Sequence, residues 1–216
     1  MTTPGDRPKP SLREILRARP WLMTGWIALL LALPVVWKLR RKAEELPVMR
    51  QLPAFTLTAQ DERPYGLGDL RGHVWVANFF FTSCPFSCPR LTRHMERVQE
   101  ALRAEGDAVR LVSFSVDPEV DTPARLREYA TRYHADARWK FLTGPAPDVQ
   151  RVSQEGFQVA MEIAAPDASA RPSNFNILHG EHIMLIDAQG RIRGYYRADA
   201  EGLARITRDA RRLVRD

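Results

Sequence analysis

The chain contains two cysteines, Cys84 and Cys88, separated by three residues in the segment CPFSC. They follow an apolar run at residues 74–81 and precede a helical pattern, so we expect them at a strand-to-helix junction. The amino end of a helix carries partial positive charge and free N–H groups, which favour thiolate over thiol. A thiolate attacks disulfides and also binds soft metal ions. The spacing therefore predicts a dithiol that is competent for redox chemistry and for metal binding.

Two other interpretations of the cysteine pair are less favoured. Both thiols could be buried hydrophobic side chains, but a loop containing Pro85 and Pro89 is a poor place for a core. They could instead form a structural disulfide, but so short a loop constrains the unfolded chain little. Apolar residues make up 44% of the sequence, enough for a core that needs no covalent staple. The spacing and the surrounding loop therefore favour a redox or metal-binding role for the two cysteines over a structural one.

The metal that such a site prefers follows from its ligands. A closed zinc site normally takes four protein ligands, and the chain has no third cysteine. Two thiolates and one imidazole form a soft, three-coordinate set that suits copper better than magnesium or calcium. We expect His73, His94 and His134 to face elsewhere or to lie at the surface. His179 and His182 remain, and an odd separation in an extended stretch turns them toward opposite faces, so spacing alone does not choose between them.

The elements that must position these residues alternate between strand and helix periods. We predict strands at residues 74–81, 109–116, 139–142, 182–187 and 191–196, the last two forming a hairpin. Helices are predicted at residues 89–104, from residue 123 onward, and at residues 200–212. This order predicts a three-layer α/β sandwich. Cys84 follows the first central strand and Asp117 the second, so both should lie at the edge where parallel strands end.

The N-terminal part has a different composition. Residues 21–37 contain no charged residue and begin and end with tryptophan, as a short membrane-spanning helix would. We therefore predict a polar tail at residues 1–20, a transmembrane anchor at 21–37, a linker at 38–52 and a folded domain at 53–216. A cleaved signal peptide is the alternative, but basic residues follow the apolar run where a small-residue cleavage site would be expected.

The net charge of +6 also belongs to the N-terminal part. Residues 1–50 contain ten Lys and Arg against four Asp and Glu, which leaves 22 of each sign in the remaining 166 residues. The folded part is therefore electrically balanced, and we predict that it does not bind nucleic acid.

Several motifs together resemble one known family. FTSCPFSCP at residues 81–89, SVDPEVDTP at residues 115–123, and a histidine six residues before Leu185 in an LID-x-x-G pattern resemble the Sco/SenC family. The resemblance extends over about residues 50–213 and includes the single N-terminal anchor. Members of this family are similar to thioredoxins and peroxiredoxins in fold. The resemblance therefore implies an α/β, thioredoxin-like three-layer sandwich with an N-terminal transmembrane helix.

The resemblance also implies roles for individual residues. Cys84 and Cys88 would be copper ligands, and His179 would be the third because it lies six residues before Leu185. Asp117 would not bind the metal itself, but would either stabilise the ligand residues or face a partner protein. The family often has Asp and Ser or Thr on either side of this histidine, where this chain has Leu178 and Gly180. His182 is therefore kept as a possible alternative ligand.

The function implied is that of a copper metallochaperone for respiratory oxidases. The domain would bind Cu+ or Cu2+ and pass it to a subunit of a haem–copper oxidase. A thioredoxin-like periplasmic reductant would keep Cys84 and Cys88 reduced, because a disulfide cannot supply two thiolates. Since disulfide cycling suits an oxidising compartment, we expect a single-pass protein of the inner membrane with its C-terminal domain in the periplasm.

Two enzymatic functions are alternatives. A thiol–disulfide oxidoreductase would use Cys84 to attack a target disulfide and Cys88 to resolve the mixed disulfide. A peroxidase is less favoured, because only Thr82 and Arg90 are near enough in sequence to activate a peroxide.

Overall fold

The computed structural model describes residues 31–33, 45–158 and 182–215. The chain separates into two compact units, Met1–Glu45 and Leu46–Asp216. In the first unit, residues 31–33 are helical, with Leu31 and Leu33 exposed. Among the described residues, no helix has the length and apolar character needed to cross a membrane. The predicted tail and most of the predicted anchor lie outside the described residues.

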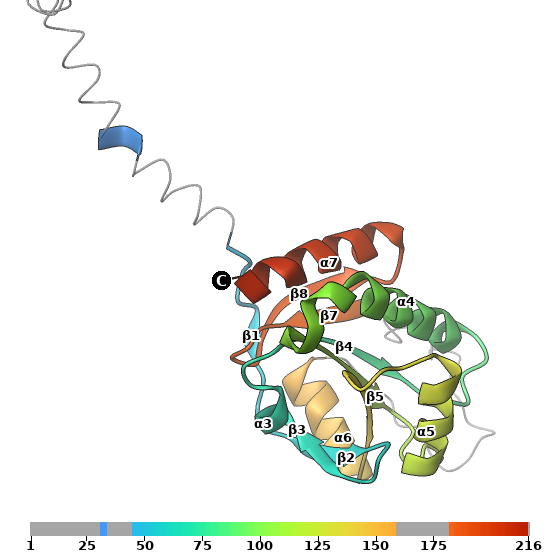
Figure 1. The fold of residues 1–216 in the computed structure, drawn as a ribbon. Coiled ribbons are helices and arrows are strands. Elements are labelled where there is room, and N and C mark those ends of the chain that lie inside the picture. Colours follow the sequence, from blue (N-terminus) through green and yellow to red (C-terminus); the bar gives the residue numbers. More distant parts are fainter. Residues whose placement is uncertain (1–30, 34–44, 159–181, 216) are drawn as a thin grey trace, which may run out of the picture. The chain divides into compact units, whose positions relative to one another are not determined.

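The second unit is built on one mixed sheet (Figure 1). Its described strands run in the order β1-β8-β7-β4-β5-β6-β2-β3. Their bounds are β1 Arg50–Gln51, β2 Thr56–Ala59, β3 Pro64–Gly66, β4 Val74–Phe80, β5 Val109–Ser115, β6 Trp139–Thr143, β7 His182–Ile186 and β8 Arg191–Arg197. The helical elements are α3 Leu67–Leu70, α4 Ser87–Ala101, η1 Arg103–Ala108, α5 Pro123–Arg132, α6 Ala146–Arg151, η2 Val152–Gly156 and α7 Ala200–Arg215.

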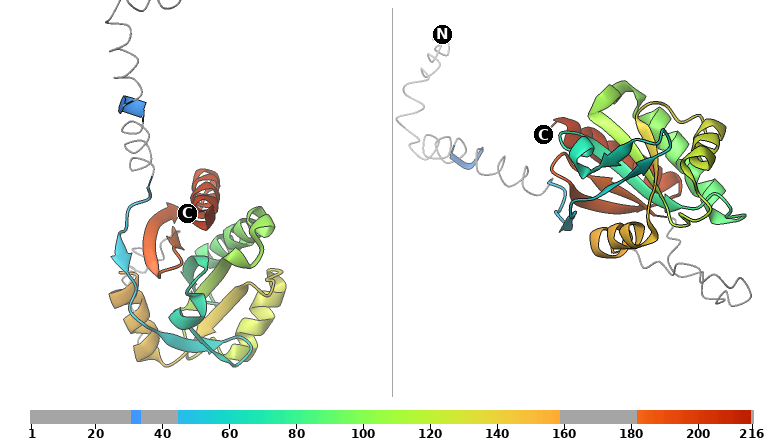
Figure 2. Two further views of the ribbon diagram at one scale, coloured as in Figure 1. Left: turned by 60° about the vertical axis from the view of Figure 1, so that its left-hand side comes forward. Right: turned by 90° about the horizontal axis from the view of Figure 1, so that it is seen from below.

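The three central strands β4, β5 and β6 are parallel, and β7 runs antiparallel to β4. Almost every residue of β4 and β5 is buried, as expected for continuous apolar runs covered on both faces. Side chains of α4, α5 and α7 cover one face of the sheet, and those of α3, α6 and η2 cover the other. Figure 2 shows α6 and α7 on opposite sides of the sheet. The predicted three-layer α/β sandwich is confirmed.

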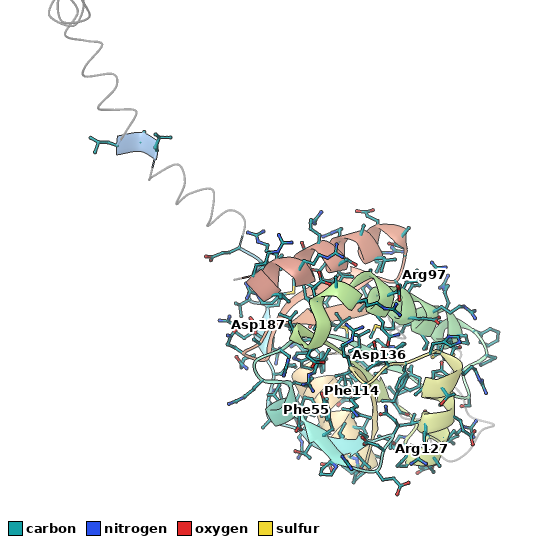
Figure 3. All side chains as sticks on the ribbon, in the orientation of Figure 1. Phe55, Arg97, Phe114, Arg127, Asp136 and Asp187 are labelled. Atoms are coloured by element: carbon teal, nitrogen blue, oxygen red, sulfur yellow. The ribbon has the colours of Figure 1, made fainter. Side chains whose placement is uncertain are left out.

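Each face has its own hydrophobic core, and alternate residues of a strand enter different cores. Val76 and Phe80 of β4 enter the core beneath α4, α5 and α7. The opposite core is rich in aromatic rings, including Phe55 and Phe114, which are labelled in Figure 3 and meet edge to face at 5.5 Å between ring centroids. This alternation decides on which side of the sheet each candidate ligand lies.

The five predicted strands and three predicted helices are all present, with ends that differ by a few residues. The helix predicted at residues 89–104 begins earlier, at Ser87, and ends at Ala101, where η1 replaces its last turn. The short elements β1, β2, β3, α3 and α6 were not predicted. Within the predicted linker, Arg50 and Gln51 pair with β8, and Leu52 is buried.

A candidate dithiol site at the end of the central strand

The cysteine pair lies where β4 meets α4, at the edge where the parallel strands end. Cys84 is in the connecting loop, and its backbone N–H donates to the carbonyl of Phe81 over 3.3 Å. Cys88 is the second residue of α4. The predicted strand-to-helix position is therefore confirmed, with one cysteine before the helix and the other in its first turn.

The exposure of the pair differs from the sequence-based expectation. The proline-containing loop favoured thiols outside the core, but Cys84 is 8% exposed and Cys88 only 2%. Both are free thiols, and both belong to the core beneath α4. The side chain displayed to solvent is that of Phe86, between them, which is 85% exposed. Both thiols therefore lie in the core, Cys84 from the loop and Cys88 from the first turn of α4.

The two thiols have opposite acid–base properties. Burial acts to raise the pKa of Cys84, but hydrogen bonds from the backbone N–H groups of Cys88 and Phe86, and from the side chains of Cys88 and Ser87, outweigh it and lower the pKa. Burial raises the pKa of Cys88 to about 12, and the neighbouring Cys84 adds to that rise. Cys84 is thus the first of the pair to become a thiolate, as expected for a sulfur facing the amino end of a helix.

The loop after β5 reaches across to the cysteine loop through Asp121, whose side chain is completely buried. The Asp121 carboxylate accepts hydrogen bonds from the backbone N–H and hydroxyl of Thr82 and from the hydroxyl of Ser115. An aspartate just before Pro123 is typical of a helix start, so this role of Asp121 was not predicted. The cap of α5 is in fact Thr122, whose hydroxyl accepts from the backbone N–H of Arg125.

Asp117 lies on the same loop and is partly buried. Its backbone N–H donates to the Ser115 hydroxyl over 3.1 Å. Burial raises the pKa of its carboxyl group, and the nearby acidic groups of Asp121 and Glu119 add to the rise. The structure therefore places Asp117 after the second central strand, as predicted, but the carboxylate that bonds to the cysteine loop is that of Asp121.

The structure describes only one of the two candidate histidine ligands. His179 lies outside the described residues. His182 is exposed and is the first residue of β7, opposite Arg197 of β8. Ile183 enters the same core as the cysteines, whereas Met184 enters the other. Since side chains alternate along a strand, His182 is directed to the face opposite Cys84 and Cys88.

The other described histidines have local roles. His94 is buried on α4, and burial, with the charges of Arg97 and Arg90, lowers its pKa. His73 Nδ1 lies 2.7 Å from a backbone carbonyl oxygen, and His134 Nδ1 lies 2.8 Å from a carboxylate oxygen of Glu96. Within the described residues, no three His, Cys, Asp or Glu side chains converge in a way that could hold a metal ion.

Thr82, one of the two residues considered for peroxide activation, contacts an arginine of α5. The Nε of Arg125 donates to the Thr82 hydroxyl over 2.7 Å. That hydroxyl also donates to Asp121. The Thr82 hydroxyl therefore accepts a hydrogen bond from Arg125, donates one to Asp121, and links the cysteine loop to the loop after β5.

Comparison with known proteins gives consistent similarities. The sequence model of the SCO1/SenC family matches residues 44–215. A SCO1 protein homolog of Bacillus subtilis is 34% identical over 147 residues, which cover 67% of this chain and 76% of that protein. A Stutzerimonas stutzeri protein provisionally named as copper-binding is 30% identical, over 74% of this chain and 77% of its own length. The structure of BsSco, described as a member of the Sco family of cytochrome c oxidase assembly proteins, aligns with a TM-score of 0.67 and 30% identity, covering 78% of this chain and 96% of BsSco.

Proposed function

Because the chain belongs to the SCO1/SenC family, we propose that it is a copper carrier that loads copper on Cys84 and Cys88 and delivers it to a haem–copper oxidase during assembly. The observation that carries this proposal is the dithiol itself: two free thiols adjoin the amino end of α4, and one of them has a lowered pKa. Thiolates are ligands of choice for Cu+. The S. stutzeri relative with a copper-binding name and the BsSco description support the same function.

Burial of the pair suits a cargo that must be held away from water and competing ligands. Cys84, the more exposed and more acidic thiol, would bind the ion first. Cys88 has a pKa raised to about 12, so it would lose its proton only as the metal takes the proton's place. Loading therefore releases at least the Cys88 proton. Delivery would release the two sulfur atoms in the same order, because a ligand of the recipient can replace the more exposed Cys84 while Cys88 still holds the ion.

We propose His179 as the third ligand. The alternation of β7 argues against His182, whose side chain is directed to the face opposite the cysteines. Asp117 is proposed to face the recipient, since it is only partly buried at the same edge of the sheet. Residues 21–37 are proposed as the membrane anchor, with the folded unit on the periplasmic side of the inner membrane. A thioredoxin-like reductant there would return an oxidised pair to two thiols before copper loads.

Copper titration of the full-length protein tests this function. The wild-type chain, with its thiols reduced, should bind one copper ion, and Cys84→Ser and Cys88→Ser should each abolish retention against a competing chelator. His179→Ala should weaken binding strongly, while His182→Ala, the matched control three residues away, should bind as the wild type does. Normal copper occupancy in either cysteine variant would exclude the carrier function. The same variants should lose oxidase assembly in cells.

Thiol–disulfide exchange is the second candidate function, and the unequal thiols favour it. The Cys84 thiolate would attack a target disulfide and displace one target thiolate, and Cys88 would then attack the mixed disulfide. The target would leave fully reduced, with a disulfide between Cys84 and Cys88. The proton of Cys88 would pass to the leaving target thiolate. This activity should survive His179→Ala, which separates it from copper carriage in an assay with a disulfide-bonded substrate.

A further inference from the structure

Phe81 and Thr82 form the short segment that joins β4 to the two cysteines. The carbonyl of Phe81 accepts the backbone N–H of Cys84 over 3.3 Å, and the backbone N–H of Phe81 donates to the sulfur of Cys88. Phe81 therefore contacts both cysteines through its backbone. Its neighbour Thr82 is tied instead to the loop after β5.

That tie is made by Asp121, a carboxylate with no exposed surface. Its Oδ2 accepts from the backbone N–H of Thr82 at 3.1 Å and from the Ser115 hydroxyl at 2.6 Å, while Oδ1 accepts from the Thr82 hydroxyl. The Nε of Arg125 lies 4.0 Å from Oδ1. Burying a carboxylate is costly unless its oxygens are hydrogen-bonded. The bonds from Thr82 that help to satisfy Asp121 also immobilise Thr82.

We propose that Asp121 is a positioning residue, which holds the Phe81–Thr82 segment so that Cys84 and Cys88 stay side by side. The use of that geometry for copper rests on the proposed function, but the positioning itself does not. Two sulfur atoms held together have a high effective concentration for each other and for a shared ion. Loosening the segment lowers this effective concentration, which makes both the Cys84–Cys88 disulfide and the two-sulfur copper complex less stable.

The chain provides a matched pair of variants. Thr82→Val removes the hydroxyl bonds that Thr82 makes with Asp121 and Arg125 and keeps the side-chain shape. Ser115→Ala removes a hydroxyl bond to the same carboxylate and the bond from the backbone N–H of Asp117, but these bonds are made from β5 and not from the cysteine loop. Both variants should lower thermal stability to a similar extent. Only Thr82→Val, and Asp121→Asn with it, should disturb the dithiol.

The experiment measures two quantities on the purified full-length chain, below the melting temperature of every variant. The first is the midpoint potential of the metal-free Cys84–Cys88 pair in a thiol–disulfide buffer, and the second is the rate at which a Cu+ chelator removes bound Cu+. Asp121→Asn and Thr82→Val should each make the disulfide about tenfold less stable, a potential about 30 mV less negative, and should speed copper loss about tenfold. Ser115→Ala should change neither by more than about twofold.

Equal changes in Thr82→Val and Ser115→Ala, or unchanged potentials in Asp121→Asn and Thr82→Val, would overturn the positioning role. The two proposals fail separately. If the wild-type chain did not bind copper, the carrier function would fail, and the metal-free potentials would still decide whether Asp121 positions the pair.

Discussion

Two buried carboxylates lie at opposite ends of the central sheet and are satisfied in different ways. Asp187, labelled in Figure 3, follows β7 at the end where β4 begins, and it is 3% exposed. It accepts from the guanidinium groups of Arg191 and Arg193 and from two backbone N–H groups of its own turn. Asp121, where β4 and β5 end, is bonded by hydroxyl and backbone groups of the cysteine loop and of β5.

The different partners indicate that one carboxylate serves mainly the stability of the fold and the other mainly the dithiol site. Two of the partners of Asp187 are guanidinium groups, and all of its partners named above lie within six residues of it, so this carboxylate closes the β7–β8 hairpin. The Asp121 bonds with Thr82 span 39 residues and end two residues from Cys84. We therefore expect the hairpin carboxylate to matter chiefly for folding and the other chiefly for the geometry of the thiols.

The largest expected effect is on stability at the hairpin end. Asp187→Ala leaves Arg193, whose side chain is only 11% exposed, without its buried partner. Breaking a buried ion pair by removing one member costs about 3–5 kcal/mol, so the free energy of unfolding should fall by about that amount in urea titration. The copper off-rate of the folded fraction should stay within about twofold of wild type. If the free energy of unfolding fell by less than about 1 kcal/mol, or if copper dissociated tenfold faster, the two carboxylates would not have the different roles described.

The next effect concerns the two thiols themselves. Hydrogen bonds outweigh burial and lower the pKa of Cys84, whereas burial raises the pKa of Cys88 to about 12. Even allowing for the greater nucleophilicity of the more basic thiolate, Cys84 should be alkylated at least about tenfold faster than Cys88 at pH 7. Mass spectrometry after brief iodoacetamide treatment of the reduced protein measures this ratio. Equal labelling of Cys84 and Cys88 would contradict the difference in pKa between the two thiols.

A smaller effect should appear as a pH dependence. Burial acts to raise the pKa of Asp187, but hydrogen bonds from Arg193 and Arg191 outweigh it and lower the pKa below 3.8. The folded state thus favours the ionised form, so this contribution to stability is complete above pH 3.8 and is lost as pH falls through the lower, folded-state pKa. Asp187→Asn, which cannot ionise, should show a flatter fall in stability below pH 4 than the wild type in urea titrations. A parallel fall would contradict the assignment.

The smallest effect tests whether any change near Asp121 disturbs the dithiol. Thr122→Ala removes the cap of α5 next to Asp121 and should cost about 1 kcal/mol of unfolding free energy. The reduction potential of the cysteine pair should not move, because Thr122 does not bond to the cysteine loop among the contacts described. A shift as large as that of Asp121→Asn would mean that the potential reports general loosening of the region.

The sequence predicted the parts of the fold whose patterns are local. The apolar runs of β4 and β5, the spacing along α4 and the turn between β7 and β8 are each readable within about fifteen residues. The short strands β1 and β2 were missed because they contribute two and four residues and are defined by their pairing with distant strands. Their hydrogen bonds, rather than their own patterns, make them strands.

The candidate site was predictable to a similar degree. The cysteine spacing and the apolar strand before it placed Cys84 and Cys88 correctly. Their burial was missed because it depends on residues such as Leu91 and Ile183 that pack around them in the core. The role of Asp121 was missed because a carboxylate before a helix is normally a cap, and its bond to Thr82 exists only once the two loops meet.

The central claim is that two sulfur atoms and one imidazole hold the copper, and X-ray absorption of the Cu+-loaded full-length protein tests it most directly. We predict two sulfur ligands and one imidazole nitrogen in the wild type and in His182→Ala, with the imidazole signal lost in His179→Ala. A copper ion without two sulfur ligands, or an imidazole that disappears in His182→Ala and persists in His179→Ala, would contradict the account.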